Sequence, residues 1–140
     1  MPFGSRAYCW DMSRENVQLV QSWFERWNRG VRDFAEDEVD PDVQVISRLR
    51  SEPFRGREGL REWFQEIDEQ FQEWEIVGDE WRDAGERVVV LGQVRLRGRE
   101  SGVAFSQPTG WLFELKGGRL FRVRNFVSPE EALEAAGLRT

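Results

Sequence analysis

Residues 86–127 decide the fold, and their sequence is ERVVVLGQVRLRGRESGVAFSQPTGWLFELKGGRLFRVRNFV. Three runs within this stretch, Arg87–Arg97, Val103–Leu115 and Arg119–Val127, are rich in Val, Leu, Phe and Trp. Such runs, bounded by Gly and charged residues, are typical of β-strands. The short turn Lys116–Gly118 joins the last two runs, so we expect them to be antiparallel neighbours. One face of the sheet then needs a cover, which the earlier part of the chain has to supply.

The length and composition indicate one globular domain. A chain of 140 residues is long enough to bury roughly 70% of the surface that its unfolded form exposes. Charged residues make up 33% of the chain, with a net charge of −6. This balance argues against nucleic acid as a partner, because proteins that bind it usually carry a basic face. The arginines do cluster, but acidic residues interleave with them, which indicates a solvated surface with ion pairs.

The cysteine content and the hydropathy pattern indicate the cytoplasm. Cys9 is the only cysteine, so the chain cannot form an internal disulfide, which fits a reducing compartment. No apolar run reaches the length of a membrane span. The first residues, MPFGSRAYCWD, lack the basic and then apolar order of a signal peptide. We therefore expect no membrane association.

The chain contains no histidine. This excludes Ser-His-Asp and Cys-His catalysis and every metal site built on histidine. We expect no metal and no cofactor. Acid–base chemistry would have to use Asp, Glu, Lys or an activated water.

The N-terminal part of the chain is predicted to be helical. We expect residues 1–12 to form a loose extension and residues 13–140 to form the domain. A helix is predicted over Ser13–Arg29, with Ser13 as its N-cap and Gly30 as its stop. Its apolar face consists of Val17, Val20, Trp23, Phe24 and Trp27. A second, short helix over Val31–Glu38 leads to a turn at residues 40–42.

The middle of the chain alternates strands and helices. Residues Val43–Arg50 are predicted to be a strand, residues 51–56 a loop and Arg57–Gln72 a helix. A further strand over Trp74–Arg82 precedes the terminal sheet. The apolar face of the helix predicted over Arg57–Gln72 consists of Leu60, Trp63, Phe64, Ile67 and Phe71. After the sheet, Ser128 is the predicted N-cap of a short helix that begins with Pro129. The order predicts an α+β domain with helices packed on one face of a curved antiparallel sheet.

Several phrases of the sequence resemble a known family. They are ENVQLVQSWFERWNRG, DPDVQV, FRGREGLREWF, DAGERVVVLGQVRLRGRESG, LFELKGGRLFRVRNF and PEEALEAAGL. From about Ser13 to Leu138 the chain resembles the SnoaL-like branch of the nuclear transport factor 2-like superfamily, which is related in fold to ketosteroid isomerase. The resemblance implies a cone-shaped α+β barrel, in which the sheet wraps around the N-terminal helices. It also implies an apolar pocket at the open end and a homodimer formed through the convex sheet face.

Side-chain alternation assigns the residues of two strands to the faces of this cone. Those assigned to the interior are Val88, Val90, Gly92, Val94, Phe121, Val123, Asn125 and Val127. Those assigned to the convex face, and so to the dimer, are Leu91, Gln93, Arg95, Arg122, Arg124 and Phe126. A β-bulge would change these assignments.

The resemblance can be followed residue by residue to ketosteroid isomerase. The position of its catalytic Asp corresponds to Ser47, and a hydroxyl is not a base at neutral pH without a partner. Its tyrosine corresponds to Trp23, and its protonated acid corresponds to Trp111; an indole offers one N–H donor. All three departures reduce reactivity, so we do not expect the isomerase mechanism.

Two further branches of the superfamily are catalytic. Polyketide cyclases of this family use an Asp with a His nearby, whereas this chain has no His and no Asp after Asp83. The epoxide hydrolases use two carboxylates bridged by an arginine. Arg95 or Arg124 could supply that arginine, but a pocket-facing pair of carboxylates is not evident unless another register brings Asp79 or Glu80 to the pocket mouth.

The content of seven tryptophans and ten phenylalanines favours an aromatic pocket. Its predicted residues are Trp23, Ser47, Trp63, Thr109, Trp111, Phe113 and Asn125. Such a pocket suits an uncharged, flat, mostly apolar molecule. The alternative is that the rings fill the cone completely. Two functions follow: a non-catalytic domain that binds a hydrophobic ligand, or an isomerase, cyclase or epoxide hydrolase acting on a small hydrophobic substrate.

Overall fold

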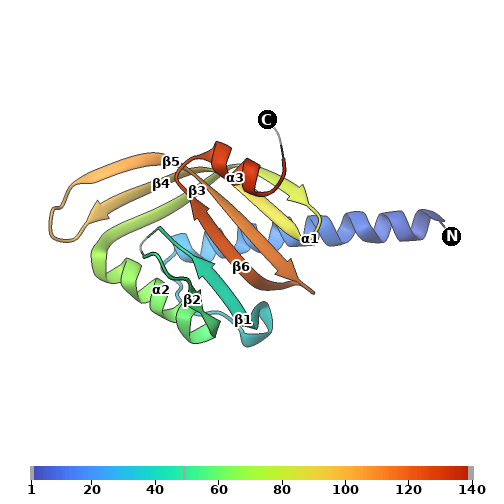
Figure 1. The fold of residues 1–140 in the computed structure, drawn as a ribbon, viewed down its shortest axis with the longest axis horizontal. Coiled ribbons are helices and arrows are strands. Elements are labelled where there is room, and N and C mark those ends of the chain that lie inside the picture. The colour runs from blue at the N-terminus through green and yellow to red at the C-terminus, as the bar shows by residue number, and fades with distance from the viewer. Residues whose placement is uncertain (1, 49, 139–140) are drawn as a thin grey trace.

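The computed structural model describes residues 2–48 and 50–138, with their side chains from residue 14 onward. Six strands form one curved, unclosed sheet. Their order across the sheet is β2 (Phe54–Arg55), β1 (Val39–Ile46), β6 (Arg119–Phe126), β5 (Ala104–Lys116), β4 (Arg87–Gly98) and β3 (Phe71–Ala84). The helices α1 (Pro2–Asn28) and α2 (Gly56–Gln70) pack on its concave face, and α3 (Pro129–Ala135) packs on the other face (Figure 1). The predicted cone-like α+β fold is confirmed.

The sheet is mixed rather than wholly antiparallel. Its antiparallel part consists of β3 (Phe71–Ala84), β4 (Arg87–Gly98), β5 (Ala104–Lys116) and β6 (Arg119–Phe126). The strand β1 (Val39–Ile46) runs parallel to β6. Parallel neighbours need a long connection, and here the elements from β2 to β5, α2 included, lie between these two strands in the chain.

The region before the sheet differs most from the prediction. The helix α1 begins at Pro2 instead of Ser13 and ends, as predicted, before Gly30, whose φ of 88° favours glycine. The predicted helix over Val31–Glu38 is wrong, because only the short 3-10 helix η1 (Glu36–Glu38) forms there. The cause is packing: the segment crosses from α1 to β1 with Phe34, partly buried, packed against the core.

The strand β1 starts and ends earlier than the predicted Val43–Arg50. Its pairing with β6 is interrupted between Val39 and Gln44, so Pro41 lies where no ladder hydrogen bond is required of it. The predicted turn at residues 40–42 is therefore part of the strand. In the predicted loop over residues 51–56, β2 (Phe54–Arg55) pairs with β1.

The hydrophobic residues form two clusters on opposite faces of the sheet. The larger one joins the concave face to α1 and α2 around Val20, Phe24, Val90 and Trp111. The smaller one lies under α3, and its members include Val89, Leu112, Ala132, Leu133 and Ala136. Ser128 caps α3 as predicted, since its Oγ accepts a hydrogen bond from the Glu131 backbone N–H.

A β-bulge changes the predicted faces of β6. Glu114 pairs with Arg122, and the next residue, Leu115, pairs with Leu120, so Phe121 is an extra residue in β6. The assignment of Phe121 to the interior is therefore wrong, and Leu120, 6% exposed, lies there instead. The Phe121 ring packs against the cations of Lys116 and Arg122.

Beyond the bulge the alternation holds. Val88 and Val90 belong to the concave cluster, as predicted, and Val123 and Asn125 contact the interior. Val127 was also assigned to the interior, but it follows the last residue of β6 and is 57% exposed.

Part of the convex face is covered by α3. Leu91 and Phe126, which were assigned to the dimer, pack against the cluster under this helix. Arg95 and Arg122 form cross-strand ion pairs with glutamates of the neighbouring strands. The part of the convex face that α3 leaves open is therefore charged.

Candidate functional site

A cavity of about 320 Å³ lies between the concave face of the sheet, α1 and α2. This volume falls within the range of roughly 300–1,000 Å³ that is usual for small-molecule sites. The polar residues of its wall are Arg26, Asp33, Ser47, Arg48, Gln107 and Asn125, and most of the others are aromatic or aliphatic. The wall therefore has the composition of a site for an apolar molecule.

The structure brings most of the predicted pocket residues together. Those that line the cavity are Trp23, Ser47, Trp63, Trp111, Phe113 and Asn125. Thr109 does not line it; this side chain is fully buried and hydrogen-bonded to Asn125. The ring nitrogen of Trp63 is buried and has no hydrogen-bond partner in the described part of the chain.

Other lining residues were missed from the sequence. Gln107 faces the cavity, as the alternation along β5 from Trp111 and Thr109 would have indicated. Trp74 also lines it, next to its β4 neighbour Leu96. Trp74 could not be placed from its own strand, since β3 reads as a mixture of charged and apolar residues on both faces.

Aromatic contacts build the wall from α1 and the sheet. Phe24 is 5% exposed and packs edge-on against Trp111, with ring centroids 5.1 Å apart, and against Trp81 at 4.9 Å. On the side of α2, the Phe64 ring contacts Trp27 and Trp63. These contacts fix ring positions by shape, so the rings fill part of the cone and form the wall of the remaining cavity.

Asn125 is held from behind by the sheet. Its Nδ2 donates hydrogen bonds to Thr109 Oγ1 at 2.9 Å and to the Gly110 carbonyl at 3.2 Å. Thr109 in turn donates its hydroxyl hydrogen to the Phe126 carbonyl at 2.8 Å. The amide group therefore has one position on the cavity wall.

Glu38 forms a second polar group beside the cavity. Its carboxylate accepts hydrogen bonds from both terminal nitrogens of Arg26, from Trp23 Nε1 and from the Ala35 backbone N–H. These bonds, above all those from Arg26, lower the pKa of Glu38 from 4.5 to about 2. A carboxylate with so low a pKa is a weak base, and its charge is neutralised by Arg26.

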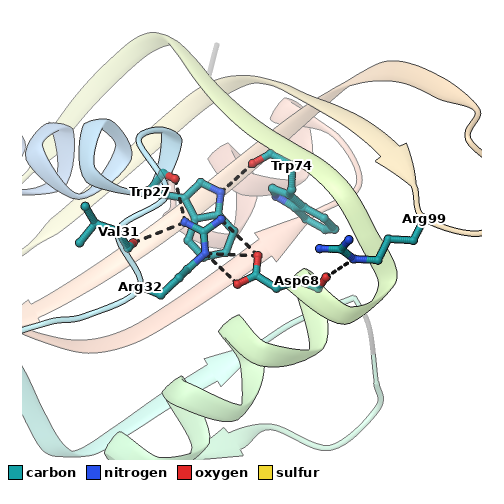
Figure 2. A network of polar contacts seen from close by, with 6 residues as sticks. All are labelled: Trp27, Val31, Arg32, Asp68, Trp74 and Arg99. Carbon is teal, nitrogen blue, oxygen red and sulfur yellow. Dashed lines mark hydrogen bonds and ion pairs between the residues drawn. The ribbon is translucent and has the colours of Figure 1, made fainter.

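A third group of contacts holds the segment that follows α1 to the end of α2 (Figure 2). The guanidinium of Arg32 lies 3.4 Å from the centre of the Trp27 ring, and its Nε and terminal nitrogen donate to the Asp68 carboxylate. Trp27 Nε1 donates to the Trp74 carbonyl, and Arg99 donates to the Asp68 carbonyl. Because Val31 and Phe34 line the cavity, this network fixes one side of its wall.

The described residues do not place a pair of carboxylates on the cavity wall. Asp79 and Glu80, the alternatives considered from the sequence, do not line it, and Glu80 pairs with Arg82. Asp33 does line it but is exposed. Groups of three or more potential metal ligands do not occur within residues 14–48 and 50–138. In the described part of the chain, the helices are too short or too polar to span a membrane.

Comparison with known families and structures fits this geometry. The family described as SnoaL-like domain matches residues 20–123. Comparison with the curated proteins gave no match.

Solved structures with a similar fold are only distantly related in sequence. An NTF2-like protein of unknown function from Burkholderia pseudomallei superposes with a TM-score of 0.74 at 19% identity, covering 86% of this chain and 95% of the other. A putative SnoaL-like polyketide cyclase from Jannaschia has a TM-score of 0.70 at 24% identity, covering 92% and 96%. TerC, co-crystallised with polyporic acid, has a TM-score of 0.72 at 15% identity, covering 88% and 98%.

Proposed function

The chain belongs to the family of SnoaL-like domains, within the nuclear transport factor 2-like superfamily, and we propose that it binds a small, uncharged, mostly apolar molecule without transforming it. The observation that carries this proposal is the cavity of about 320 Å³ with its aromatic wall. Apolar surface of this kind favours a ligand that leaves water. TerC, a structural relative, was crystallised with a small organic molecule, which supports the same kind of occupant here.

The electrostatics of the wall favour an uncharged ligand. Arg26 is a cation of the cavity wall, and Glu38 neutralises it. Asp33 and Arg48 have opposite charges and are exposed. A charged ligand would lose its hydration inside the cavity without gaining an unpaired counter-charge.

The arrangement of titratable groups favours binding over catalysis. A general base has to reach the reacting proton and to have a pKa near the working pH. The carboxylate of Glu38, which is bonded to the lining residues Trp23 and Arg26, has a pKa of about 2 and is engaged by four donors. Ser47 and Trp111 line the cavity, but neither a serine hydroxyl nor an indole takes up a proton at neutral pH.

Native mass spectrometry of the purified protein, first under gentle and then under denaturing conditions, tests this proposal. We expect a bound organic compound that is released intact and whose mass does not change when it is incubated with fresh protein. A compound that is converted during this incubation would instead support an isomerase, cyclase or epoxide hydrolase. Protein that carries no compound, and that binds none of the aromatic probes described below, would contradict the proposal.

The same spectrum tests the oligomeric state. We propose a cytoplasmic homodimer that uses the convex face not covered by α3, which includes Gln93, Arg95, Arg122 and Arg124. The support is the two ion pairs on this open face, which could rearrange between subunits. A spectrum that shows monomer alone at micromolar concentration would contradict the dimer and leave the proposed binding function untouched.

A further inference from the structure

Asn125 is the cavity residue whose hydrogen-bonding role the structure defines most completely. Both hydrogens of its Nδ2 are used inside the wall, one by Thr109 Oγ1 and one by the Gly110 carbonyl. The side chain is half-buried and lines the cavity. What this residue offers to a ligand therefore depends on its other polar atom, Oδ1.

The orientation of this amide cannot be reversed. The Gly110 carbonyl can only accept a hydrogen bond. Thr109 Oγ1 gives its single hydrogen to the Phe126 carbonyl, so toward Asn125 it also acts as an acceptor. A flipped amide would set its oxygen against two acceptors and leave two N–H groups without partners. Asn125 therefore presents Oδ1, and Oδ1 alone, to the cavity.

Oδ1 is available to a ligand. Within the described residues, the side-chain hydrogen bonds of Asn125 are the two that its Nδ2 donates. The side chain of Gln107, the other amide on the wall, forms no hydrogen bond in that part of the chain, so it can rotate to donate or to accept. Of these two amides, Asn125 alone imposes a direction: its Oδ1 is an acceptor, and the group that meets it has to be a donor.

From this geometry we infer that the ligand carries a hydroxyl or N–H group that donates to Asn125 Oδ1, on an otherwise apolar and flat molecule. Phenols and alcohols belong to this class, whereas the corresponding ethers, ketones and hydrocarbons do not. The inference rests on the proposed function, because it names the class of ligand for the same cavity. A molecule without a donor would displace water from Asn125 Oδ1 and leave this oxygen without a hydrogen bond. Because an unpaired, desolvated polar atom costs free energy, such a molecule should bind more weakly.

Binding of three matched probes tests the inference. They are 2-naphthol, which has a donor, and 2-methoxynaphthalene and 2-methylnaphthalene, which have none but share the ring system. Calorimetric titration of the intact protein gives each dissociation constant. We expect 2-naphthol to bind about five- to tenfold more tightly than either of the others, as one net hydrogen bond provides.

Variants identify the acceptor. In Asn125→Leu, which removes Oδ1 and keeps the volume, the preference for 2-naphthol should fall to less than twofold. In the control Gln107→Leu, on the same wall, it should remain. Asn125→Ala, which also removes Oδ1, provides a second route if Asn125→Leu does not fold. In this variant too, the preference for 2-naphthol should fall to less than twofold.

Each other outcome contradicts a different statement. Equal binding of the three probes would overturn the donor requirement while supporting a cavity for apolar molecules. A preference for 2-naphthol that persists in Asn125→Leu or in Asn125→Ala would show that another group receives the hydroxyl. Failure of all three probes to bind at the limit of their solubility would contradict the proposed function itself.

Discussion

Successive side chains of each strand point in turn to the concave and to the convex face of the sheet, yet the two faces carry different kinds of side chain. On β4 and β5 the concave side chains include Val88, Val90, Trp111 and Phe113, all buried. Outside the area that α3 covers, the convex side is dominated by cross-strand ion pairs such as Glu75–Arg95. Apolar burial therefore holds the fold together on the concave face and under α3, whereas the rest of the convex face contributes charge and little cohesion.

Replacement of a concave aromatic residue should have the largest effect. Trp111→Ala removes a ring that is 5% exposed and packs on Phe24, so we expect a loss of roughly 3–5 kcal/mol in the free energy of unfolding. The cavity should also enlarge and change its affinity for 2-methylnaphthalene. Urea unfolding and calorimetric titration measure the two effects.

Trp81→Ala is the matched control for this change. Trp81 also packs on Phe24 but does not line the cavity. It should destabilise the protein while changing the affinity for the probe much less than Trp111→Ala does. Equal changes in affinity would show that the cavity wall has been assigned to the wrong rings.

The bulge in β6 shifts which side chains of this strand point to the concave and to the convex face. Substitution of two adjacent residues, Leu120 and Phe121, tests whether the bulge is present. Leu120 is buried in the concave cluster, whereas Phe121 packs outside against cations. We expect Leu120→Ala to cost roughly 2–4 kcal/mol of unfolding free energy and Phe121→Ala about 1 kcal/mol or less. Thermal and urea unfolding of both variants measure this order, and the reverse order would mean that β6 continues without a bulge.

The bulge also marks how far the sequence alone could lead. The strands β4 to β6 were predicted because β-branched and aromatic runs between glycine turns are a local signal. Phe121 was misplaced because a bulge depends on pairing with Glu114 and Leu115 across the sheet, which no local pattern reveals. The segment at residues 31–38 was predicted as a helix because its long-range contacts, such as those of Arg32 with Asp68, are invisible in the sequence.

In the candidate site, too, the features that local alternation determines could be predicted, whereas those that depend on long-range contacts could not. Trp111 and Phe113 could be placed on the cavity wall because they lie on one face of the same strand, β5. Asn125 could be placed there because it lies on the same sheet face in the neighbouring strand β6. Thr109 shares that face as well but lies behind Asn125, since its hydroxyl is consumed by hydrogen bonds within the sheet. Such a distinction requires the partners of each polar atom, and these become visible only in three dimensions.

The ion pair between Arg26 and Glu38 should have an intermediate effect, because it belongs to the concave side but is only partly buried. The pKa of Glu38 is lowered from 4.5 to about 2, so its contribution is fully present above pH 4.5 and is lost as the pH falls toward 2. After allowance for solvent, we expect Glu38→Gln to cost about 1–2 kcal/mol at pH 7.

Urea unfolding of the natural protein and of Glu38→Gln between pH 7 and pH 2 measures this contribution. The difference in unfolding free energy should shrink as the pH falls and should vanish near pH 2. Glu58→Gln is the control, because Glu58 forms a surface pair with Arg61. A difference between the natural protein and Glu38→Gln that stays constant over the whole range would show that Glu38 acts through packing and not through its charge.

The convex face should show the smallest effects, which a double-mutant cycle on Glu75 and Arg95 measures. Their side chains are 49% and 57% exposed, so we expect a coupling of about 0.2–0.5 kcal/mol that disappears in 1 M salt. The pair Glu114–Arg122 is less exposed and should couple more strongly. If the Glu75–Arg95 coupling is instead the larger one, resists salt and rises with protein concentration, a second subunit must shield it. In that case the charged face would contribute cohesion between subunits, and the contrast with the concave face would hold only for the isolated chain.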